Sequence, residues 1–235
     1  MQRIARFFFA VALIFISSVI SINANQGIGL TALYNGVNVR NNLALCLSDF
    51  VIIAITVFNN LGKCEQYLFG YGKYCLVRHK KRDLLLINIL FKSIGFCVII
   101  VFLRTIVFLL IAIFSTGLEF INYNSLVNFI FINITTLFHL TCIQIVLELS
   151  ISSFVGLVSS LFYYIISVFL GGTLISNEIY FPLLFMTPNF YMKTRSDLLC
   201  EALGLNLINL YIILYSYILL LTITSKLIIK KKDIF

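Results

Sequence analysis

The run LLLINILFKSIGFCVIIVFLRTIVFLLIAIF extends from Leu84 to Phe114 and contains only two charged side chains, Lys92 and Arg104. An α-helix needs about 20 apolar residues to cross the roughly 30 Å hydrocarbon core of a bilayer. The apolar residues of this run are continuous, whereas the strands of a membrane barrel alternate between apolar and polar positions. The run therefore predicts a transmembrane helix.

Five further apolar runs of similar character flank this one, and together they predict an all-α polytopic membrane protein. Hydrophobic residues make up 61% of the 235 positions and charged residues only 11%, a balance that excludes a soluble domain of this size. We expect six transmembrane helices in a single membrane domain, residues 1–235. The other five runs are Phe7–Ile22, Leu45–Leu61, Leu126–Leu149, Ile151–Ile175 and Leu203–Ser225.

The first run also fits a second interpretation. Arg3 and Arg6 precede it and the small-residue stretch SINAN follows it, as in a secretory signal peptide that is cleaved from the mature chain. Cleavage would leave five spans and place the two ends of the mature chain on opposite sides. We expect the run to be retained as the first span.

The Lys and Arg residues outside the spans predict the orientation of the chain. Basic residues next to a span resist translocation and gather on the cytoplasmic side. With six spans and both termini cytoplasmic, that side carries Arg3, Arg6, Lys63, Lys73, Arg78, Lys80, Lys81, Arg82, Lys226 and Lys230–Lys232, whereas the opposite side carries only Arg40, Lys193 and Arg195.

The connection between the second and third spans, residues 62–83, is longer than a usual helix–helix link and mixes aromatic with basic side chains. Two interpretations stay open: an anchor on anionic lipid, or a docking element for a cytoplasmic partner. A nucleic-acid patch is disfavoured by the flanking spans. The residues that would act here are Tyr71, Tyr74, Arg78, His79, Lys80, Lys81 and Arg82.

Three stretches carry a resemblance to a known family. YCLVRHKKRDLLL leads into the third span, NEIYFPLLFMTPNFYMKTRSDLLC precedes the sixth, and KLIIKKKDIF closes the chain. This layout resembles the permease subunits of type-2 ATP-binding-cassette exporters, especially small bacterial permeases of peptide or bacteriocin export and immunity. The resemblance covers nearly the whole chain but rests on layout and loose motifs.

The resemblance implies a multi-pass protein of the bacterial plasma membrane that exports or clears a peptide, bacteriocin or lipid-like substrate. It implies that residues 62–83 form a coupling segment that touches a separate ATPase, which binds the ATP and magnesium. It also implies a second permease copy or a paralogue. In residues 176–200 it implies an extracellular re-entrant segment, with an outer gate at Tyr180, Phe181, Pro182 and Pro188.

Motifs for enzyme chemistry are absent from the sequence, so we expect a transport subunit that is not itself an enzyme. No Walker A loop, zinc-protease helix or nucleophile elbow is present. The six Cys residues show neither C-x-x-C spacing nor a metal-ligand cluster, so no metal or other cofactor is expected in this chain. A disulfide between Cys46 and Cys200 stays open because both lie toward the outer side.

Polar side chains within the predicted spans are the candidate functional residues of the membrane interior: Lys92, Arg104, His139, Gln144 and Glu148. A polar group at this depth is costly and marks a candidate functional site. Lys92 and Glu148 have matching depths near the inner interface. No carboxylate matches Arg104, which is expected to meet polar groups and carbonyls of a neighbouring helix or to face the second permease. His139 is expected to make packing hydrogen bonds.

The fifth connection, Ser176–Cys200, contains both prolines of the chain and the apolar stretch YFPLLFM. Apolar side chains are costly to leave in water, so Tyr180–Met186 is expected to fold against the membrane edge or a partner. Lys193, Arg195 and Asp197 are expected to remain in water. The segment is either an outer gate or an interfacial helix that anchors the hairpin.

Two other functions stay open. A substrate-binding membrane subunit of a vitamin importer is also a compact six-span protein with a separate ATPase, although the outer connections show no ligand cluster. A structural partner of another membrane protein without transport activity is the second alternative.

Overall fold

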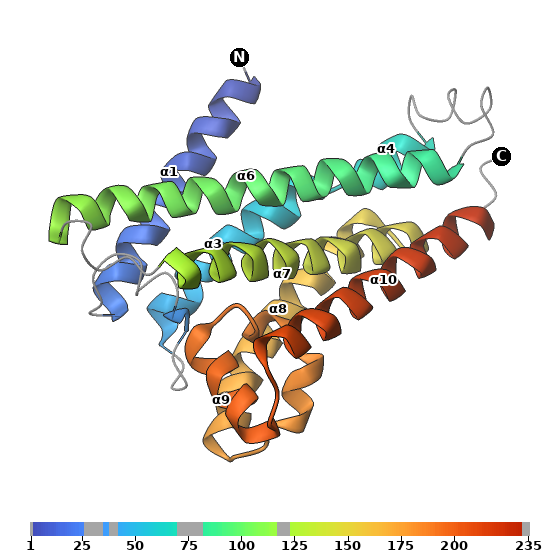
Figure 1. The fold of residues 1–235 in the computed structure, drawn as a ribbon. Coiled ribbons are helices and arrows are strands. Elements are labelled where there is room, and N and C mark those ends of the chain that lie inside the picture. The colour runs from blue at the N-terminus through green and yellow to red at the C-terminus, as the bar shows by residue number, and fades with distance from the viewer. Residues whose placement is uncertain (1, 26–34, 38–41, 70–81, 117–122, 232–235) are drawn as a thin grey trace.

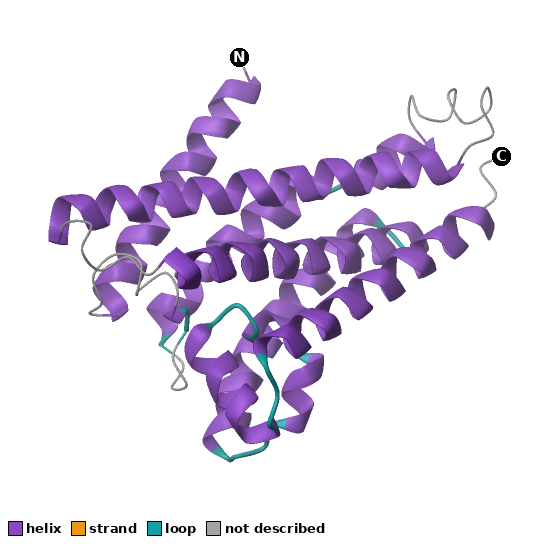
Figure 2. Cartoon of the chain, viewed as in Figure 1, coloured by secondary structure: helices purple, strands orange, loops and turns teal. Residues whose placement is uncertain are grey.

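The computed structural model describes residues 2–25, 35–37, 42–69, 82–116 and 123–231. Over this part of the chain the fold is a bundle of long α-helices with no strand (Figure 2). The helices are α1 (Gln2–Asn25), α3 (Leu43–Asn60), α4 (Lys63–Phe69), α6 (Arg82–Thr116), α7 (Tyr123–Ser150), α8 (Ser153–Ser176), α9 (Lys193–Leu203) and α10 (Leu207–Lys231), with 3₁₀ helices η1 (Phe181–Phe185) and η2 (Thr187–Asn189).

Among the residues that the structure describes, five of the long helices are apolar enough and long enough to cross a membrane, so the all-α polytopic part of the prediction is confirmed. Their candidate spans are Leu43–Gln66, Leu84–Ile111, Leu126–Ser150, Ser153–Ser176 and Leu207–Lys230. Helix α1 has 24 residues and includes the apolar stretch Ala10–Asn23. Each helix lies within a few residues of the run that predicted it.

Helix α7 is the centre of the bundle. It packs against α6, α8, α10 and α3, and it is the most buried of the five spanning helices (Figure 1). Helix α1 packs on α3 and α6, and α10 covers α7 from the other side. Most residues of α10 that point away from α7 are exposed, as expected for a lipid-facing surface.

Hydroxyl side chains are accommodated in the apolar helices by hydrogen bonds to carbonyls one turn earlier. Thr56 bonds to Ile52 O at 2.9 Å and Thr105 to Val101 O at 2.8 Å. Such bonds satisfy the hydroxyl within its own helix, so these residues need no partner on a neighbouring helix.

The two ends of the bundle are built differently. At the end that we call the α4 end, Cys64 of α4 is buried with Leu86 of α6, Leu149 of α7 and Ile229 of α10 in a small apolar cluster. At the opposite end, which we call the α9 end, α7 and α10 begin side by side, and Tyr211 donates a hydrogen bond to Asn128 O at 3.0 Å. The segment between α8 and α10 belongs to the α9 end (Figure 1).

Candidate functional site

Residues 177–192 connect α8 to α9 and enter the bundle instead of lying over its end, so we call them the re-entrant segment. Thr187 at its tip bonds to His139, which lies 16 residues, or about 24 Å, from the start of α7. Tyr163, which also bonds to the tip, lies 13 residues, or about 20 Å, from the end of α8. The tip is therefore well inside the bundle when compared with a hydrocarbon core of about 30 Å.

The chain is not α-helical at this depth because Pro182 and Pro188 stand in the first turns of η1 and η2. Backbone groups released from a helix need new partners inside a membrane. Tyr163 supplies them: its hydroxyl donates to Phe185 O at 2.7 Å and accepts from Thr187 N at 3.2 Å. The side chain of Thr187 also bonds to Nδ1 of His139 at 2.9 Å.

The other side of the re-entrant segment is held by Asn189 and Arg195. Nδ2 of Asn189 donates to Ser167 O at 3.0 Å, and its Oδ1 accepts from Arg195 at 2.6 Å. Arg195 also donates to Val168 O at 2.7 Å and to Val37 O at 3.1 Å. The guanidinium of Arg195 therefore connects α9 to α8, to the re-entrant segment and to the residues before α3.

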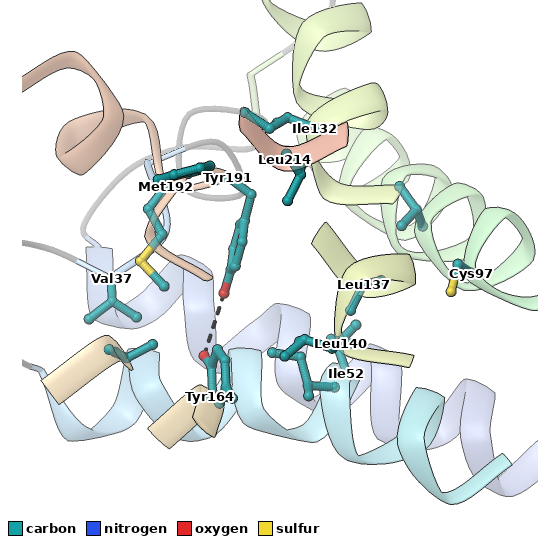
Figure 3. Packing of buried hydrophobic residues seen from close by; sticks show 14 of the residues in the cluster. Val37, Ile52, Cys97, Ile132, Leu137, Leu140, Tyr164, Tyr191, Met192 and Leu214 are labelled. Carbon is teal, nitrogen blue, oxygen red and sulfur yellow. Dashed lines mark hydrogen bonds between the residues drawn. The ribbon is translucent and has the colours of Figure 1, made fainter. Parts of the chain in front are cut away.

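The re-entrant segment also contacts a buried ion pair. Arg104 of α6 donates to Oδ1 of Asp49 of α3, and each residue is only 3% exposed. Tyr191, which follows η2, donates to the other oxygen of Asp49 at 3.0 Å. Because the hydroxyl hydrogen of Tyr191 is engaged in the bond to Asp49, the oxygen of Tyr191 accepts from Tyr164 of α8 at 3.4 Å (Figure 3).

We call Asp49, Arg104, Tyr164, Asn189, Tyr191 and Arg195 the buried polar network. Burial raises the pKa of Tyr191 well above its usual value, with a further contribution from Asp49, so this phenol is a neutral donor. Burial lowers the pKa of Arg195, and nearby Cys46, Tyr191, Tyr164 and Asp49 act in the opposite direction. A guanidinium stays protonated in proteins, so the network holds two cations and one carboxylate among the residues that the structure describes.

A second polar site lies at the α4 end. The backbone amide of Glu65 in α4 donates to Oε1 of Glu148 near the end of α7, at 3.1 Å. One turn earlier on α7, Gln144 donates to Val57 O of α3 at 3.0 Å. On the α3 side, Asn60 accepts from Lys63 at 2.8 Å and from Ser93 of α6 at 3.0 Å. Hydrogen bonds thus connect α4 to α7 and α7 to α3.

A family model matches residues 4–235, nearly the whole chain. The chain belongs to the DUF2705 family. The family is described as proteins of unknown function, so membership assigns neither transport nor any other activity to this chain. No curated protein and no solved structure matches the chain.

Two predictions about charged residues of this DUF2705 chain are wrong. Arg104 does have a carboxylate partner, Asp49, which the sequence analysis did not consider. Arg195 is 1% exposed and not in water, because the re-entrant segment folds over it; Lys193 and Asp197 are exposed as predicted. Cys46 and Cys200 are free thiols, so the disulfide left open by the sequence is not present in the structure.

The remaining predicted residues of this DUF2705 chain fall into three groups. His139, Gln144 and Glu148 make the contacts given above, and Lys92 lies exposed on α6. In the predicted outer gate, Pro188 is buried, Tyr180 and Pro182 are half-buried, and Phe181 is exposed. Arg82 begins α6, whereas the other predicted coupling residues lie outside the described residues: Tyr71, Tyr74, Arg78, His79, Lys80 and Lys81.

Asp49, Tyr164 and Tyr191 were not among the functional residues predicted from the sequence. Asp49 left a usable signal, since it is the only charged residue in the run Leu45–Leu61. Tyrosines at membrane depth leave a weaker one, because they are common in apolar helices as well as in polar networks. Only the folded chain brings Tyr191 to Asp49 and Tyr164 to Tyr191.

Proposed function

We propose that this protein is the membrane-spanning subunit of an ATP-binding-cassette exporter, and that α4 is its docking element for a separate ATPase. The observation that supports the proposal most is the attachment of α4 to the bundle. This short helix begins within the candidate span Leu43–Gln66, buries Cys64 in the apolar cluster of the α4 end and bonds through its backbone to Glu148.

A docking helix must be held firmly if it is to pass a displacement to the spans. The Glu65–Glu148 bond joins α4 to α7, and the Gln144–Val57 bond joins α7 to α3 one turn further into the bundle. The side chains of Glu65 and Gln66 are exposed, which leaves them available to a partner. These contacts favour a docking element over a lipid anchor that needs no fixed connection to α7.

In the proposed arrangement α1 is the first of six spans, both termini are cytoplasmic, and the α4 end is the cytoplasmic end. The excess of Lys and Arg in the connections at that end supports this orientation. The substrate class is a peptide, bacteriocin or lipid-like molecule, and a second permease copy completes the transporter. ATP and magnesium are held by the ATPase, and the membrane is the bacterial plasma membrane.

Co-purification and site-specific crosslinking test the proposal. The chain, isolated from its native membrane in a mild neutral detergent, is expected to retain an ATPase. A Gln66→Cys variant is expected to crosslink to that ATPase, whereas the matched control Asp197→Cys, exposed at the α9 end, is not.

Impermeant thiol reagents applied to intact cells give the orientation, with Asp197→Cys labelled and Gln66→Cys protected. If no ATPase accompanies correctly inserted protein and Gln66→Cys never crosslinks, α4 is not a docking element. A tightly bound vitamin in the purified protein would point to the importer instead.

A further inference from the structure

His139 of α7 is the side chain at which three other parts of the bundle meet. Its Nδ1 bonds to Oγ1 of Thr187, at the tip of the re-entrant segment, at 2.9 Å. Its ring centroid lies 6.2 Å from that of Tyr163 in α8 and 5.9 Å from that of Tyr217 in α10. The residue is only 4% exposed. The imidazole therefore connects the re-entrant segment to three helices.

The neighbouring hydrogen bonds determine which nitrogen of the imidazole carries hydrogen. Tyr163 donates its single hydroxyl hydrogen to Phe185 O at 2.7 Å, so its oxygen is an acceptor toward Thr187. The hydroxyl of Thr187 can donate to that oxygen at 3.2 Å or to Nδ1 of His139 at 2.9 Å. The shorter contact assigns the hydrogen bond to Nδ1, which is then an acceptor, and places the ring hydrogen on Nε2. The tip is thus held by a neutral imidazole.

A positive charge on His139 would meet no carboxylate in the part of the chain that the structure describes. The two rings beside it belong to phenols, which stay neutral below about pH 10. No charged group among the described residues acts electrostatically on the imidazole. The two rings lie near the outer limit of a cation–π contact and offset only part of the cost of a buried cation. Binding a proton here is therefore unfavourable while the segment is inserted.

The charged groups of the elements around His139 are either paired with each other or distant from it. Asp49 of α3 and Arg104 of α6 form the buried ion pair. Helix α8 contains no charged residue, and the re-entrant segment contains only Glu178, which is exposed next to the end of α8. The remaining charged groups that the structure describes on the helices packed against α7 lie toward the α4 end, among them Lys63, Glu65, Lys92, Glu148 and Lys226.

We propose that His139 is a proton-binding site that controls the position of the re-entrant segment. While the segment is inserted, His139 is neutral and accepts from Thr187. A proton on Nδ1 turns this acceptor into a donor and leaves a cation among aromatic rings. The cation is better accommodated when the segment moves away and water reaches the ring, so acid shifts the population toward a displaced segment. The inference goes beyond the proposed function, because the switch lies within this chain and operates without an ATPase.

The direction and the pH range of the effect follow from the chemistry of imidazole, which ordinarily takes up a proton near about pH 6.5. The displaced form binds a proton below this pH more readily than the inserted form does. Each further unit of pH below it therefore raises the ratio of displaced to inserted protein by up to about tenfold. Above it, both forms are neutral and the ratio no longer depends on pH.

Electron paramagnetic resonance of a spin label on the re-entrant segment tests the switch. The label is attached at Phe181→Cys, an exposed position in η1, in the purified chain in neutral detergent. Cys75 and Cys200 are replaced by Ser, because the other four native thiols are buried. The label is expected to be immobile at about pH 7.5 and to gain a mobile component at about pH 5, reversibly. A label at Ile223→Cys, exposed on α10, is expected to stay unchanged and so excludes general unfolding.

The two histidines of the chain supply matched variants. His139→Asn keeps an acceptor oxygen near the place of Nδ1 but takes up no proton in this range, so the label at Phe181→Cys is expected to be immobile at both pH values. His79→Asn is the control and keeps the response of the wild type. If His139→Asn does not fold, His139→Gln, which also has no titrating ring, replaces it.

Nitrogen NMR of protein labelled with ¹⁵N-histidine adds a measurement that needs no substitution at His139. At neutral pH the shifts of His139 are expected to be those of a neutral ring with its hydrogen on Nε2, and His79→Asn identifies which signals are its own. The label is expected to become mobile as these signals change to those of the imidazolium. A label that stays immobile at about pH 5, or a mobile component that persists in His139→Asn, overturns the proposal.

Discussion

Tyr163 accepts a hydrogen bond from the backbone amide of Thr187, although the first residue lies in the middle of α8 and the second lies on the segment that turns back from the end of α8. The same hydroxyl donates to the carbonyl of Phe185. One side chain thus serves both backbone groups next to the junction of η1 and η2. This contact satisfies two backbone groups of a segment that is not α-helical and that enters the bundle, where unpaired backbone groups are costly.

Replacing Tyr163 with Phe is expected to destabilise the protein by about 1–3 kcal/mol, because the amide of Thr187 and the carbonyl of Phe185 lose a shared partner. The measurement is denaturant or thermal unfolding in detergent. The control is Tyr215→Phe, which removes the hydroxyl of an exposed tyrosine on α10. An equal loss in the two variants would mean that the hydroxyl of Tyr163 is not needed.

Gly171 of α8 is expected to tolerate no side chain. A Cβ at this position would lie 2.4 Å from Oδ1 of Asn189, which Arg195 holds in place. Gly171→Ala should therefore cost about 1–3 kcal/mol of stability through overpacking.

The matched control for Gly171 is Gly95→Ala in α6, where a new Cβ meets nothing within 4 Å. That change is expected to be neutral or slightly stabilising, because Ala favours a helix over Gly. If unfolding midpoints fall equally in both variants, the close approach of Asn189 to α8 is not a constraint.

Asp49 and Arg104 are expected to show strong coupling in a double-mutant cycle. Asp49→Asn and Arg104→Gln each leave a buried charge unpaired and should cost about 3–5 kcal/mol, whereas the double variant should cost clearly less than their sum. Unfolding in detergent supplies the four free energies. Additive losses would show that the pair does not interact in the folded protein.

Glu148 is expected to restrict the motion of α4. Glu148→Leu removes the acceptor for the amide of Glu65, so a spin label at Gln66→Cys should become more mobile in electron paramagnetic resonance spectra. Glu148→Gln keeps an acceptor oxygen in the same place and is the conservative control. Equal label mobility in the wild type and the Leu variant would remove the proposed attachment of α4 to α7.

The thiol of Cys200 in α9 is expected to be slow to alkylate at neutral pH. Partial burial raises its pKa, and Asp197 adds to the effect. A raised pKa leaves less thiolate, the reactive form, at a given pH, so the rate profile should lie at higher pH than that of an unperturbed cysteine.

Alkylation of a variant that retains only Cys200 gives this profile, and Asp197→Asn should move it back toward lower pH. A profile equal to that of a free cysteine, unchanged by Asp197→Asn, would contradict the environment described for α9.

The sequence by itself determined the class of fold and the position of its helices. The run Leu84–Phe114 predicted α6, whose bounds are Arg82–Thr116, because a long uninterrupted apolar stretch has few stable conformations in a membrane other than a helix. His139 was expected to make a packing hydrogen bond and does so with Thr187. The position of α6 follows from local composition alone. The hydrogen bond of His139 follows from the cost of burying one polar group without a partner.

Only the tertiary structure decided which polar groups meet. Asp49 and Arg104 are 55 positions apart, and their pairing depends on how α3 and α6 are placed against each other. Arg195 stands in a polar stretch that the sequence assigned to water. Arg195 is buried because the chain leaves the α-helical path at Pro182 and Pro188, enters the bundle as far as Thr187 and returns along α8. Hydrogen bonds between this segment and Tyr163, His139 and Ser167 of α7 and α8 set that path.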